Sequence, residues 1–470
     1  MTTASAPQIA SLAELRESGY ESRTVRQELR DNLIARLREQ QPLFEAIHGY
    51  ETTVIPQLQN AIIAGHDIIL LGERGQAKTR IARSLTTLLD PWMPIVAGSE
   101  VNDDPLRPIS AFGKAVVAEK GEVTPIDWVP RDRRFAEKLA TPDTTVADLI
   151  GEVDPIKVAE GRYLSSEEII SFGLIPRTNR GIFNLNELPD LAERIQVGLL
   201  NILEEQDVQI RGFQVRLPID LLVVASANPE DYTNRGRIIT PLKDRFGSQI
   251  RTHYPETVEF ENRIVEQERT HPAVPGIDVR LPDYMQDIVT EISHLARQSP
   301  VVSRRSGVSV RMSVANTEAV IANAIRRALA TGESQAVPRI SDLDAIYPAS
   351  MGKIEFETFG EGRDEDALER IVGEAIRTVF LQRVDPTMLG PLITAFDNGL
   401  VVSIGEDADA YSYIHQVSSV DGLADIAASL VTSNSPQEMA AAIEFILEGL
   451  HQVRRVSRRH RAGTGTTYAA

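Results

Sequence analysis

Short apolar runs alternate with helical patterns over the middle of the chain. The runs at residues 68–71, 182–183 and 221–224 are apolar at every position and are bounded by polar or glycine-containing turns. A strand of this kind is buried on both faces, and strands that alternate with helices form a parallel sheet. The pattern therefore predicts an α/β core over about residues 47–255, with a parallel sheet flanked by helices.

Outside this core the apolar residues recur at helical spacing. Residues 1–46 are predicted to form a helical lead-in, and residues 256–340 a helical region with a break near residues 271–282. Residues 341–470 are predicted to form a further, mostly helical domain that glycine and proline interrupt. The chain closes on an arginine-rich run followed by glycine and threonine, and this tail is expected to be disordered.

Composition narrows the classes of function. The 470 residues include 67 acidic and 49 basic side chains, which gives a net charge of −18. This excess argues against coating DNA or docking on anionic lipid, because both require a positive field. Cysteine is absent, so disulfides, thiolate zinc sites and a cysteine nucleophile are excluded. No apolar stretch approaches the ~18 residues of a membrane span and no secretory leader is visible, so a cytoplasmic protein without membrane insertion is expected.

The first apolar run leads into a glycine-bearing loop and then a helix-competent stretch at residues 80–89. In such a loop, backbone N–H groups and the helix N-terminus bind phosphates, Lys78 adds a full charge, and the Thr79 hydroxyl ligates Mg²⁺. Ala77 stands where a second glycine is usual, which costs little if its φ is negative. A chance glycine turn is the competing interpretation, but the whole context predicts binding of ATP and Mg²⁺. The nucleotide-binding residues of the loop are Gly72, Glu73, Arg74, Gly75, Gln76, Ala77, Lys78 and Thr79.

A second buried run, at residues 181–185, ends in Asn186 and Glu187. In nucleotide hydrolases with this loop, the first acid after such a strand holds the Mg²⁺ shell and the second orients the attacking water. Asn186 keeps an acceptor oxygen for a metal-bound water but lacks the charge. Glu187 is the candidate general base, and a solvated carboxylate at a strand end is the competing interpretation.

These motifs and further segments in the expected order resemble the AAA+ ATPases, in the branch that contains the MoxR proteins and the I subunit of magnesium chelatase. The resemblance covers about residues 47–340 and implies a P-loop NTPase core followed by an α-helical lid at residues 256–340. Residues 149–180 are similar to the insertion of chelatase-type members, and residues 208–217 to their β-hairpin. The other matching segments are Ile47-His48-Gly49-Tyr50, Leu199 to Glu205, Ala225 to Glu230, Leu242-Lys243-Asp244-Arg245-Phe246-Gly247 and Gly307-Val308-Ser309-Val310-Arg311.

The resemblance implies a role for each matched position. Asn228 falls on the sensor-1 position, where an amide can hydrogen-bond the attacking water or the γ-phosphate. Arg245 matches the arginine finger, which would reach a neighbouring subunit's nucleotide. Arg311 matches the sensor-2 arginine of the lid, and His48, Gly49 and Tyr50 correspond to the adenine side of the site. The implied catalytic set is Glu187, Asn228, Arg245 and Arg311, with Thr79 and Asn186 at the metal.

The resemblance also implies a hexameric ring motor that hydrolyses ATP and remodels a partner protein. One version drives Mg²⁺ or Co²⁺ into a tetrapyrrole held by other chelatase subunits. The other is a MoxR-type chaperone that acts with a protein bearing a von Willebrand factor A domain. A third hypothesis is a nucleotide-binding scaffold that hydrolyses little ATP because Asn186 replaces an acid. A DNA-acting motor is disfavoured by the charge and by the lack of a recognisable DNA-binding module, so no nucleic-acid partner is expected.

Overall fold

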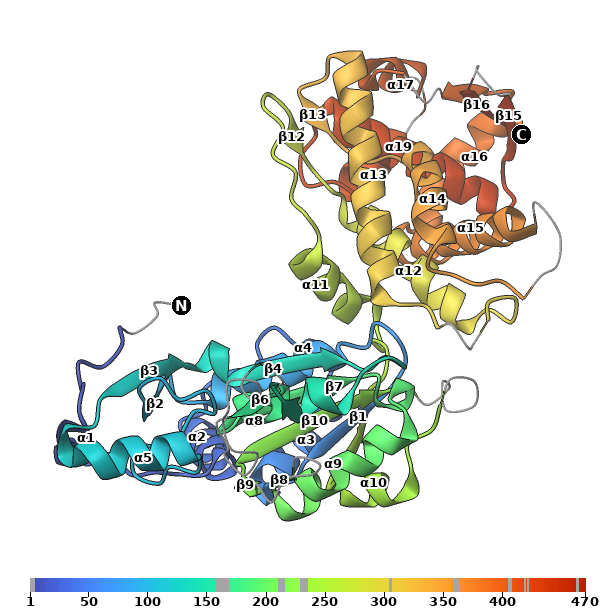
Figure 1. Cartoon of the computed structure of the whole chain (residues 1–470). Coiled ribbons are helices and arrows are strands. Elements are labelled where there is room, and N and C mark those ends of the chain that lie inside the picture. Colours follow the sequence, from blue (N-terminus) through green and yellow to red (C-terminus); the bar gives the residue numbers. More distant parts are fainter. Residues whose placement is uncertain are drawn as a thin grey trace. The chain divides into compact units, whose positions relative to one another are not determined.

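The computed structural model describes residues 5–154, 156, 169–209, 216–228, 236–303, 307–357, 363–404, 408–417, 420, 422–461 and 465–470. The chain divides into two compact units, Met1–His253 and Tyr254–Ala470, which run from blue to green and from yellow to red in Figure 1. Each unit has its own hydrophobic core. Within the described residues, no helix is long and apolar enough to cross a membrane.

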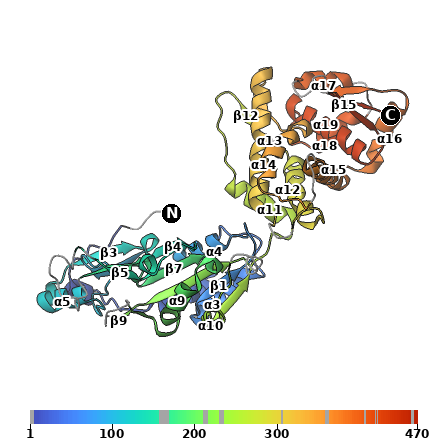
Figure 2. The same ribbon diagram turned by 45° about the vertical axis from the view of Figure 1, so that its right-hand side comes forward.

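The first unit is built on a five-stranded sheet in the order β11-β1-β10-β7-β4, with every neighbouring pair parallel. The predicted α/β core with a parallel sheet is thereby confirmed. The order places β10 between β1 and β7, and Figure 1 shows these three strands side by side. Figure 2 shows β1 and β7 of the same sheet in a view turned by 45°. The strands are β1 (Ile68–Leu71), β4 (Phe135–Leu139), β7 (Gly181–Asn186), β10 (Leu221–Ala227) and β11 (Ser248–Arg251).

Helices and small antiparallel pairs of strands complete this unit. The helices are α1 (Leu12–Glu17), α2 (Val25–Arg38), α3 (Val54–Ala64), α4 (Lys78–Ser84), α5 (Ala111–Lys120), α6 (Val146–Leu149), α8 (Leu174–Arg177), α9 (Glu193–Glu205) and α10 (Thr240–Arg245). The pairs are β2 (Trp92–Val96) with β3 (Ile126–Pro130), β5 (Gly151–Val153) with β6 (Ile170–Phe172), and β8 (Asp207–Gln209) with β9 (Arg216–Pro218). The last pair lies where the hairpin was predicted. Residues 157–168 of the predicted insertion and 210–215 of the hairpin lie outside the described residues.

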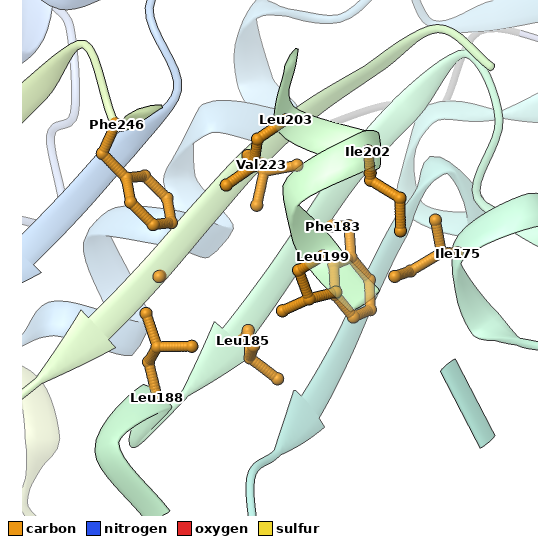
Figure 3. Close-up of a pocket in the computed structure, with 10 residues that line it drawn as sticks. Ile175, Phe183, Leu185, Leu188, Leu199, Ile202, Leu203, Val223 and Phe246 are labelled. Carbon is orange, nitrogen blue, oxygen red and sulfur yellow. The ribbon is translucent and has the colours of Figure 1, made fainter. Parts of the chain in front are cut away.

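Both faces of the sheet are covered, which explains why β1 is apolar at every position and why β10 and β7 are apolar apart from Ser226, Asn184 and Asn186. Successive side chains of a strand point to opposite faces, so Ile68 and Leu70 pack with α2, α3 and α4, while Ile69 and Leu71 belong to the core beneath α9 and α10. Figure 3 shows side chains from α9, β7 and β10 facing one another around a small apolar cavity on the second side. Its lining is Ile175, Phe183, Leu185, Leu188, Leu199, Ile202, Leu203, Val223, Ala225 and Phe246.

Buried ion pairs attach the N-terminal helix α2 to the sheet. Arg134, directly before β4, donates to the two carboxylate oxygens of Glu28 at 2.7 and 2.5 Å, and both side chains are buried. Arg26 pairs with Asp67, directly before β1, at 2.8 Å. Removing one member of such a buried pair leaves an uncompensated charge, at a cost of about 3–5 kcal/mol. The lead-in that the sequence sets apart over residues 1–46 therefore packs as part of the first unit.

The second unit is mostly helical, as predicted, and its helices share one main core. Tyr284 and Phe445 stack in this core with ring centroids 4.5 Å apart, although they lie on either side of the predicted boundary at residues 340–341. Helical periodicity shows which face of a helix is apolar but not which helices share a core. The helices are α11 (Val258–Glu268), α12 (Asp283–Gln298), α13 (Val310–Thr331), α14 (Ile346–Met351), α15 (Arg363–Arg383), α16 (Gly390–Asp397), α17 (Ala410–Val417), α18 (Leu423–Ser429) and α19 (Pro436–Gln452).

The end of the chain forms strands, so the prediction of a disordered tail is wrong for residues 465–470. β16 (Gly465–Ala469) pairs antiparallel with both β14 (Val402–Ile404) and β15 (Ser457–Arg461). Tyr468 on β16 is buried, and its hydroxyl donates to Glu448 at 2.5 Å. A segment rich in glycine and threonine is flexible only where it has no partner strand. Here β14 and β15 both pair with this segment. A further short parallel pair joins β12 (Asp278–Val279) and β13 (Gln335–Ala336).

A cluster of charged side chains is buried in the second unit. Arg327 donates to Asp342 at 2.8 Å, and Ser341 donates to Glu444 on α19 at 3.3 Å. Arg339 is also fully buried beside them. Burial raises the pKa of Glu444 to about 7, even though the positive charges of Arg339 and Arg327 favour its ionised form. Compared with the unfolded chain, the folded protein therefore favours the protonated form of the Glu444 carboxyl.

Stability is expected to fall with rising pH because of Glu444. A carboxyl whose folded pKa is raised stabilises the fold below its unfolded pKa of 4.5, and this contribution is lost as the pH rises to about 7. The loss is on the order of 3 kcal/mol, since one pKa unit corresponds to ~1.4 kcal/mol. Urea unfolding at several pH values should show wild type losing stability relative to Glu444→Gln over this window. Glu374→Gln, on the exposed side of α15, is the control, and parallel curves for wild type and Glu444→Gln would contradict the prediction.

Candidate functional site

Three groups of predicted site residues in the first unit lie at the carboxyl ends of β1, β10 and β7. Asn186 is the last residue of β7, Asn228 directly follows β10, and the glycine-bearing loop directly follows β1. The register pairs Leu71 with Ala227, and the backbone N–H of Gly72 continues the ladder by donating to the Ala227 carbonyl at 3.1 Å. The loop thus starts beside the strand end that carries Asn228.

The lysine of the phosphate-binding loop forms hydrogen bonds with backbone carbonyl groups of the same loop. Lys78 Nζ donates to the carbonyl oxygens of Gly72 and Glu73 at 2.5 and 2.7 Å. Gln76 Oε1 accepts from the Glu73 backbone N–H at 3.0 Å and from Thr252 Oγ1 at 2.8 Å. A Cβ on Gly72 would lie 1.9 Å from Thr252 Oγ1, so this position requires glycine. The loop is held in shape by side chains at its base.

Ala77 adopts a left-handed conformation, with φ 54° and ψ 15°. A negative φ, the condition under which alanine would cost little at this position, is therefore not met. Ala77 is the residue directly before α4, where the chain turns from the loop into the helix. A left-handed alanine costs roughly 1–2 kcal/mol relative to a right-handed one, a cost that glycine does not incur. The loop keeps the turn that a second glycine would make, at the cost of strain.

Tyr50 supports the loop from the predicted adenine-side segment. Its hydroxyl lies 3.0 Å from the Gln76 carbonyl oxygen and 2.6 Å from the His253 carbonyl oxygen, and burial raises its pKa. The Tyr50 ring meets the His253 ring edge-on, with centroids 4.9 Å apart. His48 and Gly49 are partly exposed beside it. Contact of this segment with adenine stays a prediction.

Asn186 lies at the centre of a polar cluster between β7 and α4. Its Oδ1 accepts from Asn184 Nδ2 at 3.1 Å, from Ser226 Oγ at 3.2 Å and from Thr79 Oγ1 at 3.4 Å. The loop threonine and the strand-end asparagine, both predicted as metal ligands, are thus in contact. Glu187 follows with a φ of 53°, and positive φ at a residue other than glycine is uncommon and gathers at functional sites.

Glu137 on β4 belongs to this cluster and was missed by the sequence analysis. Its Oε1 accepts from Asn186 Nδ2 at 2.6 Å, and its Oε2 accepts from Arg83 of α4 at 2.9 Å. The register of the parallel strands pairs Glu137 with Asn184. One signal was available: Asn184 precedes Asn186 by two residues, so both point to one face of a strand that is otherwise apolar. Nothing in the sequence shows that β4 pairs with that strand.

Asn228 and Arg245 take different surroundings. Asn228 is 2% exposed at the end of β10, and the segment 229–235 that follows lies outside the described residues. Arg245 ends α10, where its Nε donates to Glu204 of α9 at 2.8 Å and its Nη1 to the Pro241 carbonyl at 2.8 Å. The arginine predicted to act on a neighbouring subunit is therefore paired with a glutamate of its own subunit.

Arg311 belongs to the second unit, as the second residue of α13, and is exposed. A buried network fixes the start of this helix. Arg297 donates to the Val308 carbonyl at 2.9 Å and to Glu261 of α11 at 2.6 and 2.9 Å. Burial opposes ionisation of Glu261, but hydrogen bonds from His294 and Arg297 outweigh it and lower its pKa to about 2. The role of Arg311 as a nucleotide sensor stays a prediction.

The oxygen donors beside Thr79 fit Mg²⁺, which prefers oxygen ligands. Thr79 Oγ1 and Asn186 Oδ1 lie together, and Asn184 Oδ1 is buried without a hydrogen-bond partner among the described residues. Within the same part of the chain, no three His, Cys, Asp or Glu side chains gather as a metal site. In nucleotide hydrolases Mg²⁺ is held mainly by nucleotide phosphates and the loop hydroxyl, and Thr79 is the residue that would supply that hydroxyl here.

Comparisons with known proteins find one matching family model and several similar magnesium-chelatase subunits. A family model described as the sigma-54 interaction domain matches residues 158–245. The magnesium-chelatase subunit ChlI of Nostoc sp. (strain PCC 7120) is 29% identical over 232 residues, which is 48% of this chain and 58% of that protein. The magnesium-chelatase 38 kDa subunit of Rhodobacter capsulatus is 26% identical over 245 residues, with 49% and 62% covered. A structure of the complex between subunits BchI and BchD of magnesium chelatase aligns at 20% identity and a TM-score of 0.37, covering 69% of this chain and 99% of that one.

The chain spans about six tenths of the length of these curated relatives. The segment that the family model matches contains the second buried strand with Asn186 and Glu187, and it extends through Asn228 to Arg245. The match therefore includes β7 and β10, which carry part of the polar cluster, whereas Glu137 on β4 and Thr79 lie outside it.

Proposed function

We propose that the chain, an AAA+ ATPase distantly related to the I subunit of magnesium chelatase and to MoxR-like ATPases, is an Mg²⁺-dependent ring motor that hydrolyses ATP to remodel a partner protein. One observation carries this proposal. Thr79 Oγ1 of the phosphate-binding loop lies 3.4 Å from Asn186 Oδ1, and Glu187 is the next residue. The groups that bind phosphate and the candidate base thus share one site.

The proposed hydrolysis uses residues of three strand ends. When ATP binds, Lys78 Nζ would exchange the carbonyl oxygens of its own loop for phosphate oxygens, and Thr79 and Asn186 are the residues that would hold Mg²⁺ and its waters. Mg²⁺ at this place would supply positive charge that offsets the charge of the phosphates. Glu187 accepts a proton from water as the water oxygen attacks the γ-phosphorus, and the bond to the bridging oxygen breaks to release ADP. Asn228 orients that water through its amide.

The partner is proposed to be a protein with a von Willebrand factor A domain or other chelatase subunits. Relatives named magnesium-chelatase subunits support the version in which ATP hydrolysis drives a metal ion into a tetrapyrrole. A MoxR-type chaperone that is unrelated to chelation is the alternative. Adding the motor and ATP to candidate chelatase subunits and following metal insertion by porphyrin fluorescence separates the two versions, because only the first yields a metallated product.

Nucleotide binding by the loop is tested with Lys78→Ala. This variant loses charge-assisted contacts to phosphate that are worth about 1.5–3 kcal/mol each, so its affinity for ATP should fall about tenfold or more. Titration with a fluorescent ATP analogue measures the change. Lys120→Ala, which removes an exposed lysine at the end of α5, should bind like wild type. Equal affinity of Lys78→Ala and wild type would refute the assignment of the loop.

A further inference from the structure

The strand that carries Asn186 lacks the acid expected at this position, yet a carboxylate lies next to it. Glu137 on β4 accepts a hydrogen bond from Asn186 Nδ2 at 2.6 Å. The Glu137 side chain is only 24% exposed, and the sheet register fixes its place opposite Asn184. The negative charge of the Glu137 carboxylate thus lies within hydrogen-bond distance of Asn186, the residue that stands where an acid is expected.

We propose that Glu137 supplies the negative charge that β7 lacks, as a positioning residue that acts through Asn186 on the Mg²⁺–nucleotide. The proposal rests on the proposed function, because it concerns how the same site holds Mg²⁺. The new element is the division of one acid's task between two residues on neighbouring strands: Asn186 offers the oxygen, and Glu137 offers the charge.

The hydrogen bonds of Asn186 show how the charge is transmitted. An asparagine amide has a donor end and an acceptor end, and its orientation is set by its partners. A carboxylate accepts hydrogen bonds and donates none. Glu137 therefore draws the donor end of Asn186, Nδ2, toward β4. The Oδ1 end then faces three donors, among them the Thr79 hydroxyl at 3.4 Å. A charge-assisted hydrogen bond also polarises the amide and makes that oxygen a better acceptor.

Arg83 opposes this effect from the other side of Glu137. Its guanidinium lies 2.8 Å from Glu137 Oε2, and its side chain is 64% exposed. An exposed ion pair of this kind adds little to stability, but the positive charge of Arg83 offsets part of the field of Glu137. Removing Arg83 and removing Glu137 should therefore change Mg²⁺ affinity in opposite directions.

The single substitution Asn186→Asp does more than restore the expected acid, because it also places a second carboxylate against Glu137. The new carboxylate would face Glu137 at the 2.6 Å separation that a hydrogen bond now occupies, and like charges at that distance repel. The structure accommodates one carboxylate in this pair. The double variant Glu137→Gln with Asn186→Asp reverses donor and acceptor while keeping one charge, so it should restore the Mg²⁺ affinity that Glu137→Gln loses.

Mg²⁺ titrations of the full chain with fluorescent ADP test the proposal without requiring turnover. Wild type should bind the nucleotide more tightly as Mg²⁺ is added. Glu137→Gln should bind it normally in EDTA but require about 10- to 100-fold more Mg²⁺ for the same tightening, the usual cost of losing an outer partner of a metal ligand. Arg83→Gln should require less Mg²⁺ than wild type, and the double variant should return toward wild type.

Four results would overturn the proposal. Equal Mg²⁺ dependence of Glu137→Gln and wild type would remove the charge effect. Weaker binding of both Glu137→Gln and Arg83→Gln, in EDTA as well as in Mg²⁺, would assign the ion pair a purely structural role. Failure of the double variant, with Glu137→Gln folded by thermal unfolding, would exclude the exchange of roles. If the affinity of wild type for fluorescent ADP does not change with Mg²⁺, the proposed function fails together with this proposal. The other three results leave the proposed function intact.

Discussion

Glu187→Gln is expected to abolish steady-state phosphate release and to leave ATP binding unchanged. Glutamine has nearly the shape of glutamate but cannot accept the proton of the attacking water, and a positioned general base contributes typically 10²–10⁴-fold to a rate. Glu187 directly follows the residue that contacts Thr79 and holds a left-handed φ of 53°. Phosphate release and binding of fluorescent ATP, measured on the same preparation, check both halves of the prediction.

The same pair of assays separates a motor from a scaffold. Glu193→Gln, at the exposed start of α9 (its side chain is 63% exposed), should hydrolyse ATP like wild type. Suppose that wild type and Glu187→Gln release phosphate at the same negligible rate with a candidate partner present. This result would support the scaffold hypothesis and would contradict the assignment of Glu187 as the base. In that case the missing charge at Asn186 would be the reason for the low rate. Slow but measurable hydrolysis that Glu187→Gln abolishes would support the motor.

The central strands could be predicted because burial on both faces leaves a simple pattern. Runs of apolar residues at 68–71 and 221–224 became β1 and β10, and the run near 182 became β7. The loop after β1 could be predicted for a similar reason, since its chemistry needs glycine, lysine and threonine at fixed spacing along one segment. In both cases the information is local in sequence.

Features that depend on distant pairing could not be predicted in the same way. Glu137 contacts Asn186 because β4 pairs with β7, and no periodicity within residues 135–139 indicates that partner. The left-handed Ala77 depends on how the loop joins α4, and the strand at the end of the chain depends on β14, about sixty residues earlier. The pairing of Arg245 with Glu204 likewise joins two helices that the sequence treats separately.

Mixing Arg245→Ala subunits with Lys78→Ala subunits is expected to restore ATPase activity that neither variant has alone. An arginine that stabilises the transferring phosphoryl group is worth about 10³–10⁵ in turnover. If Arg245 acts on the neighbouring subunit, each single-variant ring is defective at every interface. In a mixed ring, some interfaces join an intact Lys78 to an intact Arg245 from the next subunit. Phosphate release measured across mixing ratios should therefore peak between the two pure variants.

The contact of Arg245 with Glu204 makes this prediction more demanding. The Arg245 side chain is 27% exposed and that of Glu204 is 54% exposed, and ion pairs at such positions contribute only ~0–1 kcal/mol. A neighbouring nucleotide, with several negative charges, can therefore draw the guanidinium away at little cost when subunits assemble. Glu204→Gln should then leave the maximal rate of the ring intact, whereas Arg237→Ala, a change at an arginine that is 77% exposed, serves as the control for loss of a surface charge. A monomer that is fully active at every concentration, or a mixture no more active than its parts, would contradict action between subunits, because the guanidinium would then act within its own chain.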